Sequence, residues 1–338
     1  MNAPRSRQHP NKRPNIGKRM AFLVAEYGIF LILLVMVVAL SILTPMVRGE
    51  QFFLTSRNIL QVLLQASINA IIALGMTFII TSGGIDLSVG SIVALAGIVA
   101  AMAMNAGAPP VLGFVIAVII GGACGLFNGL LITKINLPPF IATLGTMGIF
   151  RGLALVISEG RPIYGFNRDF LRIFAGRIGE VPVQVLVALV LAVVCWLLLT
   201  QTRFGKYTQA IGGDETTAKL AGIAVARYKL EIYLLGGLLT GVAAALLTAR
   251  LSSADPTVGQ LFELDAIAAT IMGGTSLTGG EGSIAGTLVG ALVISLVRNA
   301  MNLLNVPTFW QQFVIGMVII LAVVLDQWRK QQARSRVG

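Results

Sequence analysis

Long apolar runs without a charged residue recur along this chain, and they constrain the fold more than any other feature. The sequence has 338 residues, of which 56% are hydrophobic and only 12% are charged. A run of about 20 apolar residues is long enough for an α-helix to cross a bilayer. In lipid such a helix satisfies its own backbone hydrogen bonds. The sequence therefore predicts an all-α polytopic membrane protein.

The apolar runs predict about ten transmembrane helices, joined by short loops. The basic residues predict their direction, because Lys and Arg gather on the cytoplasmic side of membrane proteins. The net charge is +11, and the basic residues cluster near the N-terminus, in a central loop and near the C-terminus. We interpret this charge as a topology signal rather than as a nucleic-acid surface, and we expect both termini in the cytoplasm. The expected spans are 27–47, 59–81, 92–104, 111–133, 140–157, 183–200, 230–249, a short segment from 265, 284–304 and 309–325.

Three regions follow from this division of the chain. Residues 1–20 are basic, rich in Pro and Asn and without apolar periodicity, which predicts a disordered cytoplasmic arm. Residues 21–326 form a single transmembrane domain, and 327–338 form a cytoplasmic tail. The one long outer loop, 159–181, mixes aromatic and basic residues, which indicates a short helix either on the membrane surface or under a partner.

The central loop, residues 202–229, is polar and lies between two apolar runs. Within it we predict one short helix: Asp214 caps its first turn, Glu215 suits its positive end, and Gly222 closes it in the left-handed conformation. A helix of this length is not stable alone in water, where about 12–15 residues are needed. It must dock either on the ends of its own spans or on another protein, through a face that contains Thr217, Leu220, Ala221 and Ala224.

Two polar segments interrupt the apolar pattern. Asp86 lies in TSGGIDLSVGS, where it either caps the third span through the N–H of Ser88 or Val89 or belongs to a polar site or gate. Glu263 and Asp265 open a segment of about 14 residues that is too short for a full span. Short segments interrupted by glycine indicate a site or a moving gate. The alternative is a pair of carboxylates stabilised by a helix N-terminus.

Other polar residues lie inside the predicted spans. Arg151 in the fifth span either faces the bundle interior or anchors the span at the outer water. The fourth span contains GGACGLFNG, whose small residues predict close packing on a neighbouring helix. The residues that we expect along a substrate path or gate are Asp86, Asn128, Arg151, Glu263, Asp265, Arg298, Asn299 and Asn302.

The sequence lacks the residues that several kinds of chemistry need. The sequence has no phosphate-binding G-x-x-x-x-G-K-[ST] loop and no recognisable nucleophile with its base, so we predict no catalytic residue. It has one histidine, His9, and two cysteines, Cys124 and Cys195, with no metal-ligand spacing, so we predict no metal site. A central loop with a docking helix favours a transporter subunit driven by a separate ATPase. An ion-coupled secondary transporter or channel is the rival hypothesis.

Four segments resemble the ribose-type sugar permeases of ATP-binding-cassette importers, in order and over residues 59–325. They are GGIDLSVGSIVAL, LPPFIATLGTM with the following Arg151-Gly152, GGDETTAKLAGI, and ARLSSADPTVGQLFELDAIAATIMGGTSLTGGEGSIAGTLVGAL. The resemblance implies a multi-pass protein of the bacterial cytoplasmic (inner) membrane. It also implies alternating access for a monosaccharide, with branched-chain amino acids or nucleosides as alternative cargoes.

The resemblance also implies partners. They are a second permease copy, cytosolic ATPase subunits that use ATP and Mg, and a periplasmic or extracellular sugar-binding protein; this chain itself holds no cofactor and binds no nucleic acid. Glu215, Ala218 and Gly222 match the E-x-x-A-x-x-x-G core of the ATPase-coupling motif, with Thr216 and Thr217 where alanines are usual. The implied coupling residues are Asp214, Glu215, Ala218, Leu220, Ala221 and Gly222.

Overall fold

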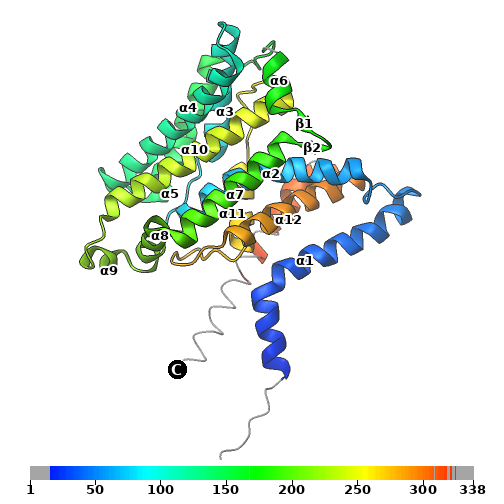
Figure 1. Ribbon diagram of the computed structural model, residues 1–338, viewed down its shortest axis with the longest axis horizontal. Helices are drawn as coiled ribbons and strands as arrows, with labels where there is room; N and C mark the ends of the chain where they lie inside the picture. The colour runs from blue at the N-terminus through cyan, green and yellow to red at the C-terminus, as the bar shows by residue number, and fades with distance from the viewer. Residues whose placement is uncertain (1–15, 167, 308, 318–319, 322–323, 325–338) are drawn as a thin grey trace, which may run out of the picture.

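The computed structural model describes residues 16–324, except 167, 308, 318–319 and 322–323. The chain folds as a bundle of antiparallel and oblique helices with one small hairpin (Figure 1). The elements are α1 (Ile16–Arg48), α2 (Ser56–Thr81), α3 (Val89–Asn105), α4 (Pro110–Thr133), α5 (Pro139–Ile157), α6 (Arg168–Phe174), β1 (Arg177–Ile178), β2 (Val181–Pro182), α7 (Val183–Gln201), α8 (Arg203–Gly213), α9 (Glu215–Leu220), α10 (Val225–Leu251), α11 (Phe262–Met272) and α12 (Ile284–Leu303).

Seven of the described helices are long and apolar enough to cross a membrane: α1, α2, α4, α5, α7, α10 and α12. This confirms the polytopic all-α class. Two further expected spans are shorter, with 17 residues in α3 and 11 in α11. The last expected span, 309–325, is described only in part, with residues 309–317 helical. A total of ten spans, and termini in the cytoplasm, stay predictions.

The two predicted terminal regions fall largely outside the described residues. Residues 1–15 of the basic arm and all of the tail 327–338 lie outside them. Residues 16–20, which we assigned to the disordered arm, belong instead to the first turns of α1. The helix therefore begins well before the apolar run at residue 27.

The core lies around α2 and α10. The most apolar part of α2 is 83% buried, and that of α10 is 78% buried, whereas α1 is only 17% buried. Glycines bring α4 and α10 into backbone contact, as the small residues predict: a Cβ added to Gly125 would lie 2.9 Å from the Cα of Gly237, and one added to Gly241 would lie 2.7 Å from the Cα of Val118.

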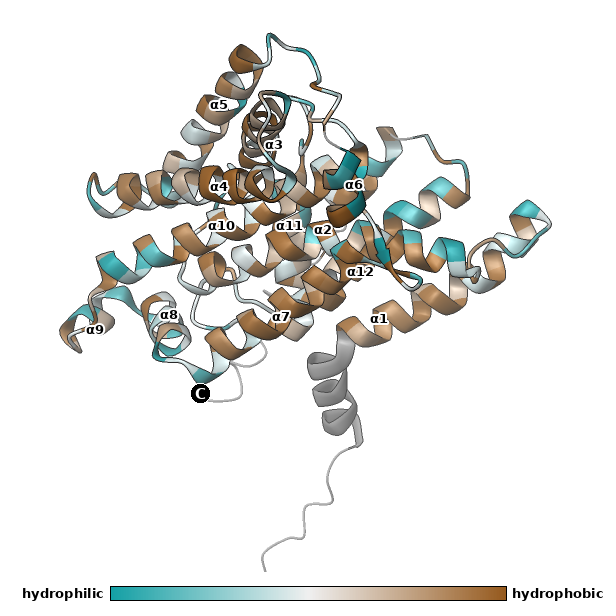
Figure 2. Cartoon of the chain, turned by 45° about the horizontal axis from the view of Figure 1, so that its top comes forward, coloured by the Kyte–Doolittle hydropathy of each residue, from teal (hydrophilic) through white to brown (hydrophobic). Residues whose placement is uncertain are grey.

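Polar residues collect at two opposite ends of the bundle (Figure 2). We call these the α9 end, with α8 and α9, and the α6 end, with α6 and the hairpin. The hairpin pairs Arg177 with Pro182 and Ile178 with Val181. At the α6 end the loop 159–181 packs onto the bundle, because Phe170 is fully buried and the rings of Phe114 and Phe174 stack 4.7 Å apart.

Two interruptions divide the apolar bundle. Residues 82–88 separate α2 from α3, with Gly83 in the left-handed region at φ +80°. The second is the short helix α11, which is followed by the loop 273–283 before α12. Each interruption coincides with one of the two polar segments that the sequence singles out.

Candidate functional site

The helix α9 has the ends that its sequence predicts. The backbone N–H of Thr217 donates a hydrogen bond to Asp214 Oδ1 at 2.8 Å, so Asp214 caps the first turn. Gly222 lies at φ +82°, and its N–H donates to the carbonyl of Lys219 at 3.0 Å. These contacts fix a helix that is too short to persist by itself.

The loop 202–229 holds a second helix, which the sequence analysis missed. Residues Arg203–Gly213 form α8, capped by the hydroxyl of Thr202, which accepts from the N–H of Gly205 at 3.3 Å. Its buried residues are Gly205, Thr208 and Ile211. That three-residue spacing is the helical signal, and it was easy to miss because two of the three residues are small or polar.

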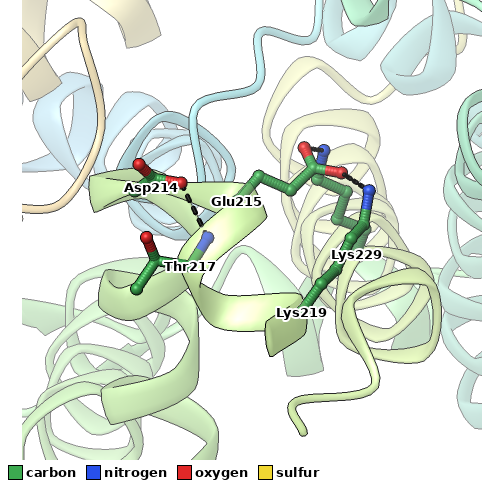
Figure 3. A network of polar contacts seen from close by, with 5 residues as sticks. All are labelled: Asp214, Glu215, Thr217, Lys219 and Lys229. Carbon is green, nitrogen blue, oxygen red and sulfur yellow. Dashed lines mark hydrogen bonds and ion pairs between the residues drawn. The ribbon is translucent and has the colours of Figure 1, made fainter. Parts of the chain in front are cut away.

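Two lysines form a clamp on Glu215, and one of them, Lys229, links α9 to α10 (Figure 3). Glu215 accepts from the ammonium group of Lys219 one turn later, with an N–O distance of 2.7 Å, and from Lys229 at the start of α10. Partial burial alone would raise the pKa of Glu215, but the two ammonium groups outweigh it, so its pKa lies below the ordinary value. The glutamate of the coupling motif is thus already paired with cations of its own chain.

The faces of α9 differ sharply in exposure. Ala218 is only 3% exposed and packs with Ile211 and Val225, whereas Leu220 is 85% exposed. Thr217, Ala221 and Ala224, the other members of the predicted docking face, are also exposed. The helix therefore rests on its own chain through Ala218, while the predicted docking face is open to solvent.

The surface around this face is basic and hollowed. Pockets of about 350 Å³ and 490 Å³ lie on the two sides of residues 221–227, and the second is lined by Lys134, Lys219 and Arg227. Arg203 and Lys206 on α8 are exposed as well. An apolar side chain, Leu220, thus projects from a cationic surface at the α9 end.

Asp86 lies in a buried hydrogen-bonded cluster. Its Oδ1 accepts from the N–H and the hydroxyl of Ser88 at 2.7 Å and 2.6 Å, and its Oδ2 accepts from Asn128 at 3.3 Å. Tyr233 on α10 donates its hydroxyl to the carbonyl of Ile85 at 3.3 Å. The capping alternative is therefore present in the bonds to Ser88, and the cluster also joins α4 to the break between α2 and α3.

The two acids of the FELD segment, both in the first turn of α11, have different surroundings. Asp265 is 1% exposed and accepts two hydrogen bonds from Arg298 on α12, at 2.9 Å and 2.7 Å. Glu263 lines a separate pocket of about 440 Å³ together with Arg151, and the other lining residues are Ser91, Met147, Gly148, Gln260, Leu261 and Gln312.

Arg151 is half-buried and is hydrogen-bonded to the turn before α11. Its Nη1 donates to the carbonyls of Pro256 and Val258, at 2.6 Å and 2.7 Å, in the turn before α11. Its half-buried position fits both alternatives for Arg151, so the choice between the bundle interior and an anchor at the outer water stays a prediction. The pocket thus combines one cation, one carboxylate, a hydroxyl and two amides.

The remaining predicted residues lie elsewhere. Asn299 exchanges two hydrogen bonds with Asn58 on α2, at 2.7 Å and 3.2 Å, and Asn302 accepts from Gln311 at 2.7 Å. These asparagines bind helix to helix rather than line the pocket with Arg151. Among residues 16–324 that the structure describes, no group of His, Cys, Asp and Glu has the arrangement of a metal site.

The chain matches a known protein family and several named relatives. The sequence model of the family described as "Branched-chain amino acid transport system / permease component" matches residues 58–323. The ribose import permease protein of Bacillus subtilis (strain 168) is 48% identical over 94% of this chain and 97% of its own length. The D-allose transport system permease protein of Escherichia coli (strain K12) is 43% identical over 89% and 91%. The L-arabinose ABC transporter permease protein of Azospirillum brasilense is 40% identical over 93% and 91%. No solved structure gives a significant match.

Proposed function

Because this chain belongs to the family of branched-chain amino acid transport system permease components, we propose that it is the permease subunit of an ATP-binding-cassette importer for a monosaccharide. The named relatives support a sugar cargo, since their names specify ribose, allose and arabinose. We further propose that the protein lies in the bacterial cytoplasmic membrane, with a second permease copy beside it. Its transmembrane domain is then 21–326, with the loop 202–229 in the cytoplasm.

The exposed face of α9 carries this proposal. The protein has no phosphate-binding loop of its own, so ATP hydrolysis belongs to a partner subunit that must contact the permease. Leu220 is an apolar anchor, almost fully exposed, on a helix whose other face is fixed by Ala218 and by the clamp at Glu215. An aliphatic or aromatic anchor that fills a pocket on the partner can form the centre of a binding interface. We therefore expect Leu220 to insert into an apolar pocket on the ATPase.

The proposed sugar path runs beside Arg151 and Glu263. Their pocket, about 440 Å³, falls within the range of about 300–1,000 Å³ that is usual for small-molecule sites. Its amide, hydroxyl and charged groups suit the hydroxyls of a sugar, which both donate and accept hydrogen bonds. A sugar released by a binding protein at the α6 end would cross this level by alternating access. Several weak hydrogen bonds are adequate, because tight binding would oppose release.

The experiment for docking compares two exposed apolar residues at opposite ends. Leu220→Glu should abolish co-purification of the partner ATPase and reduce uptake of radiolabelled D-ribose into vesicles at least tenfold. Ile178→Glu, in the hairpin at the α6 end and 67% exposed, should leave ATPase binding unchanged. ATPase binding by Leu220→Glu at the wild-type level would refute the docking site. Uptake that continues without any ATPase would instead support the secondary transporter.

The proposed topology has its own experiment. A reporter that is active only outside the cytoplasm should give signal when fused at Arg168 or Asp255, which lie at the α6 end. The same reporter should give none at Asp214. Signal at Asp214 would place α9 on the wrong side for a cytosolic ATPase and would end the proposal.

A further inference from the structure

The end of α8 touches two other segments through bare backbone. A Cβ added to Gly212 would overlap the carbonyl oxygen of Thr81 and lie 2.6 Å from the amide nitrogen of Gly280. A Cβ added to Gly279 would lie 2.5 Å from the carbonyl oxygen of Gly212. The N–H of Gly280 also donates a hydrogen bond to the carbonyl of Thr81 at 2.9 Å. We call these four residues, Thr81, Gly212, Gly279 and Gly280, the glycine junction.

The junction joins the elements that the proposed function must connect. Gly212 lies three residues before Glu215, the first residue of α9. Thr81 is the last residue of α2 and directly precedes the break at 82–88. Gly279 and Gly280 lie in the loop between α11 and α12 (Figure 1). The docking helix is therefore one contact away from both interruptions of the bundle.

Both interruptions lead to the pocket that we assign to the sugar path. The break at 82–88 continues into α3, whose Ser91 lines the pocket, and α11 contributes Glu263. A displacement at the junction therefore reaches two walls of the pocket through short, packed segments. Close-packed protein interiors compress little, so such a displacement is passed on rather than absorbed.

The link from α9 to the junction is equally short. Ala218 on α9 packs against Ile211 on α8, and the N–H of Asp214 donates to the carbonyl of Ala210 at 3.2 Å. A force on Leu220 thus reaches Gly212 through one helix contact. The left-handed conformation of Gly279 and Gly280, at φ +83° and +85°, lets the loop approach this closely.

We infer that the glycine junction passes the movement of α9 to the two broken segments beside the pocket, so that Gly212 and Gly279 are positioning residues for transport. The inference rests on the proposed function. It predicts that α8 and the loop 273–283 move as one body, and that a side chain forced between them separates ATP hydrolysis from sugar movement.

The first experiment places a methyl group in the junction. Gly212→Ala is compared with Gly213→Ala, where a Cβ meets nothing within 4 Å. Gly279→Ala is compared with Gly274→Ala in the same loop, which shares the left-handed conformation at φ +91° and also meets nothing within 4 Å. The permease is co-purified with its ATPase, reconstituted with the binding protein, and assayed for ATP hydrolysis and D-ribose uptake. We expect the two junction variants to keep ATPase binding and hydrolysis within twofold of wild type while the ratio of sugar carried to ATP hydrolysed falls at least tenfold.

The outcomes separate the inference from a general loss of structure. Gly213→Ala should behave as wild type in every assay, and Gly274→Ala should keep the wild-type ratio of uptake to hydrolysis despite its strained backbone. A wild-type ratio of uptake to hydrolysis in both junction variants would overturn the inference, and so would a loss of uptake that only follows the loss of bound ATPase. If the wild-type protein itself neither binds an ATPase nor takes up sugar, the proposed function is wrong. That result differs from each of the outcomes that test the glycine junction.

A second experiment leaves the junction unaltered and measures whether its two sides move together. Spin labels are attached to cysteines at two exposed positions, Lys206→Cys on α8 and Glu281→Cys in the loop 273–283. Cys124 and Cys195 are replaced by alanine in this background. The distance between the labels should be the same in the ATP-free and the ATP-bound complex, since the two segments move together. A distance that changes when ATP binds would show that they slide past each other, which overturns the inference even where the alanine variants do not fold.

Discussion

Two acidic residues of this permease are paired with cations in very different surroundings. Asp265 on α11 is almost fully buried and binds Arg298 on α12 with both oxygens. Glu215 on α9 is 41% exposed at its side chain and lies between Lys219 and Lys229. Breaking a buried pair leaves an unpaired charge inside the protein, whereas exposed pairs contribute little to stability. The same kind of ion pair thus stabilises the bundle in one place and, in the other, fixes the direction of α9, the helix that we propose as the docking element.

The largest effect should come from removing the cation of the buried pair. Arg298→Met leaves Asp265 without a partner and should lower the free energy of unfolding by about 3–5 kcal/mol. Thermal unfolding in detergent measures this loss. The double variant Asp265→Asn with Arg298→Met should recover much of it, because no charge is then left unpaired. If Arg298→Met were as stable as the wild type, the pair of Asp265 and Arg298 would not stabilise the bundle. The contrast with the pair at Glu215 would then be wrong.

A smaller effect is expected for the other buried acid. Asp86→Asn keeps the shape but weakens the bonds from Ser88 and Asn128, because an amide oxygen is a poorer acceptor than a carboxylate. We expect normal insertion and yield in the membrane but sugar uptake reduced severalfold. Asn128→Asp would place a second carboxyl group beside Asp86 and should reduce uptake more strongly. Unchanged uptake in Asp86→Asn would reduce the role of Asp86 to capping α3.

Breaking the clamp at Glu215 should lower the free energy of unfolding least of the three changes. Lys229→Met removes one cation from Glu215, whose side chain is 41% exposed and still pairs with Lys219. The loss should therefore be near the value of about 0.2–1 kcal/mol for solvent-exposed pairs, and the unfolding temperature should hardly move. ATPase affinity should fall nonetheless, because α9 loses its fixed direction. Lys206→Met, also exposed on this surface but outside the clamp, is the control for lost charge. Equal effects of the two variants would mean that charge alone matters.

The pH dependence of ATPase binding tests the pairing of Glu215 with its two lysines. The pKa of Glu215 lies below its ordinary value of 4.5 in the folded protein, so its contribution to stability is fully present above that value. It is lost only as the pH falls through the folded pKa. ATPase binding should therefore show no step from this clamp between pH 8 and 6. A step in that range that disappears in Glu215→Gln would contradict the assigned ion pair.

The sequence predicts the positions of helices far better than the contacts between them. The apolar run 111–133 corresponds to α4 at Pro110–Thr133. Helical spacing groups Leu220 with Thr217 and Ala221 on one face, and all three are exposed. The pairing of Asp265 with Arg298 was not predictable, because periodicity gives the face of each residue but not the neighbour that it meets. The same holds for Lys229 and Glu215. Helix α8 was missed because its buried face contains Gly205 and Thr208 rather than large apolar residues.

The glycine packing between α4 and α10 has a practical consequence for measuring motion in this protein. No side chain separates the two backbones where Gly121 and Gly125 meet Gly237 and Gly241, so neither helix can shift along the other without a collision of main-chain atoms. The pair therefore supplies an internal frame of reference. Spectroscopic labels placed one on each of these helices should report a constant separation throughout the transport cycle, and distances from that frame to α5, α9 or α11 can then be assigned to movement of those elements alone.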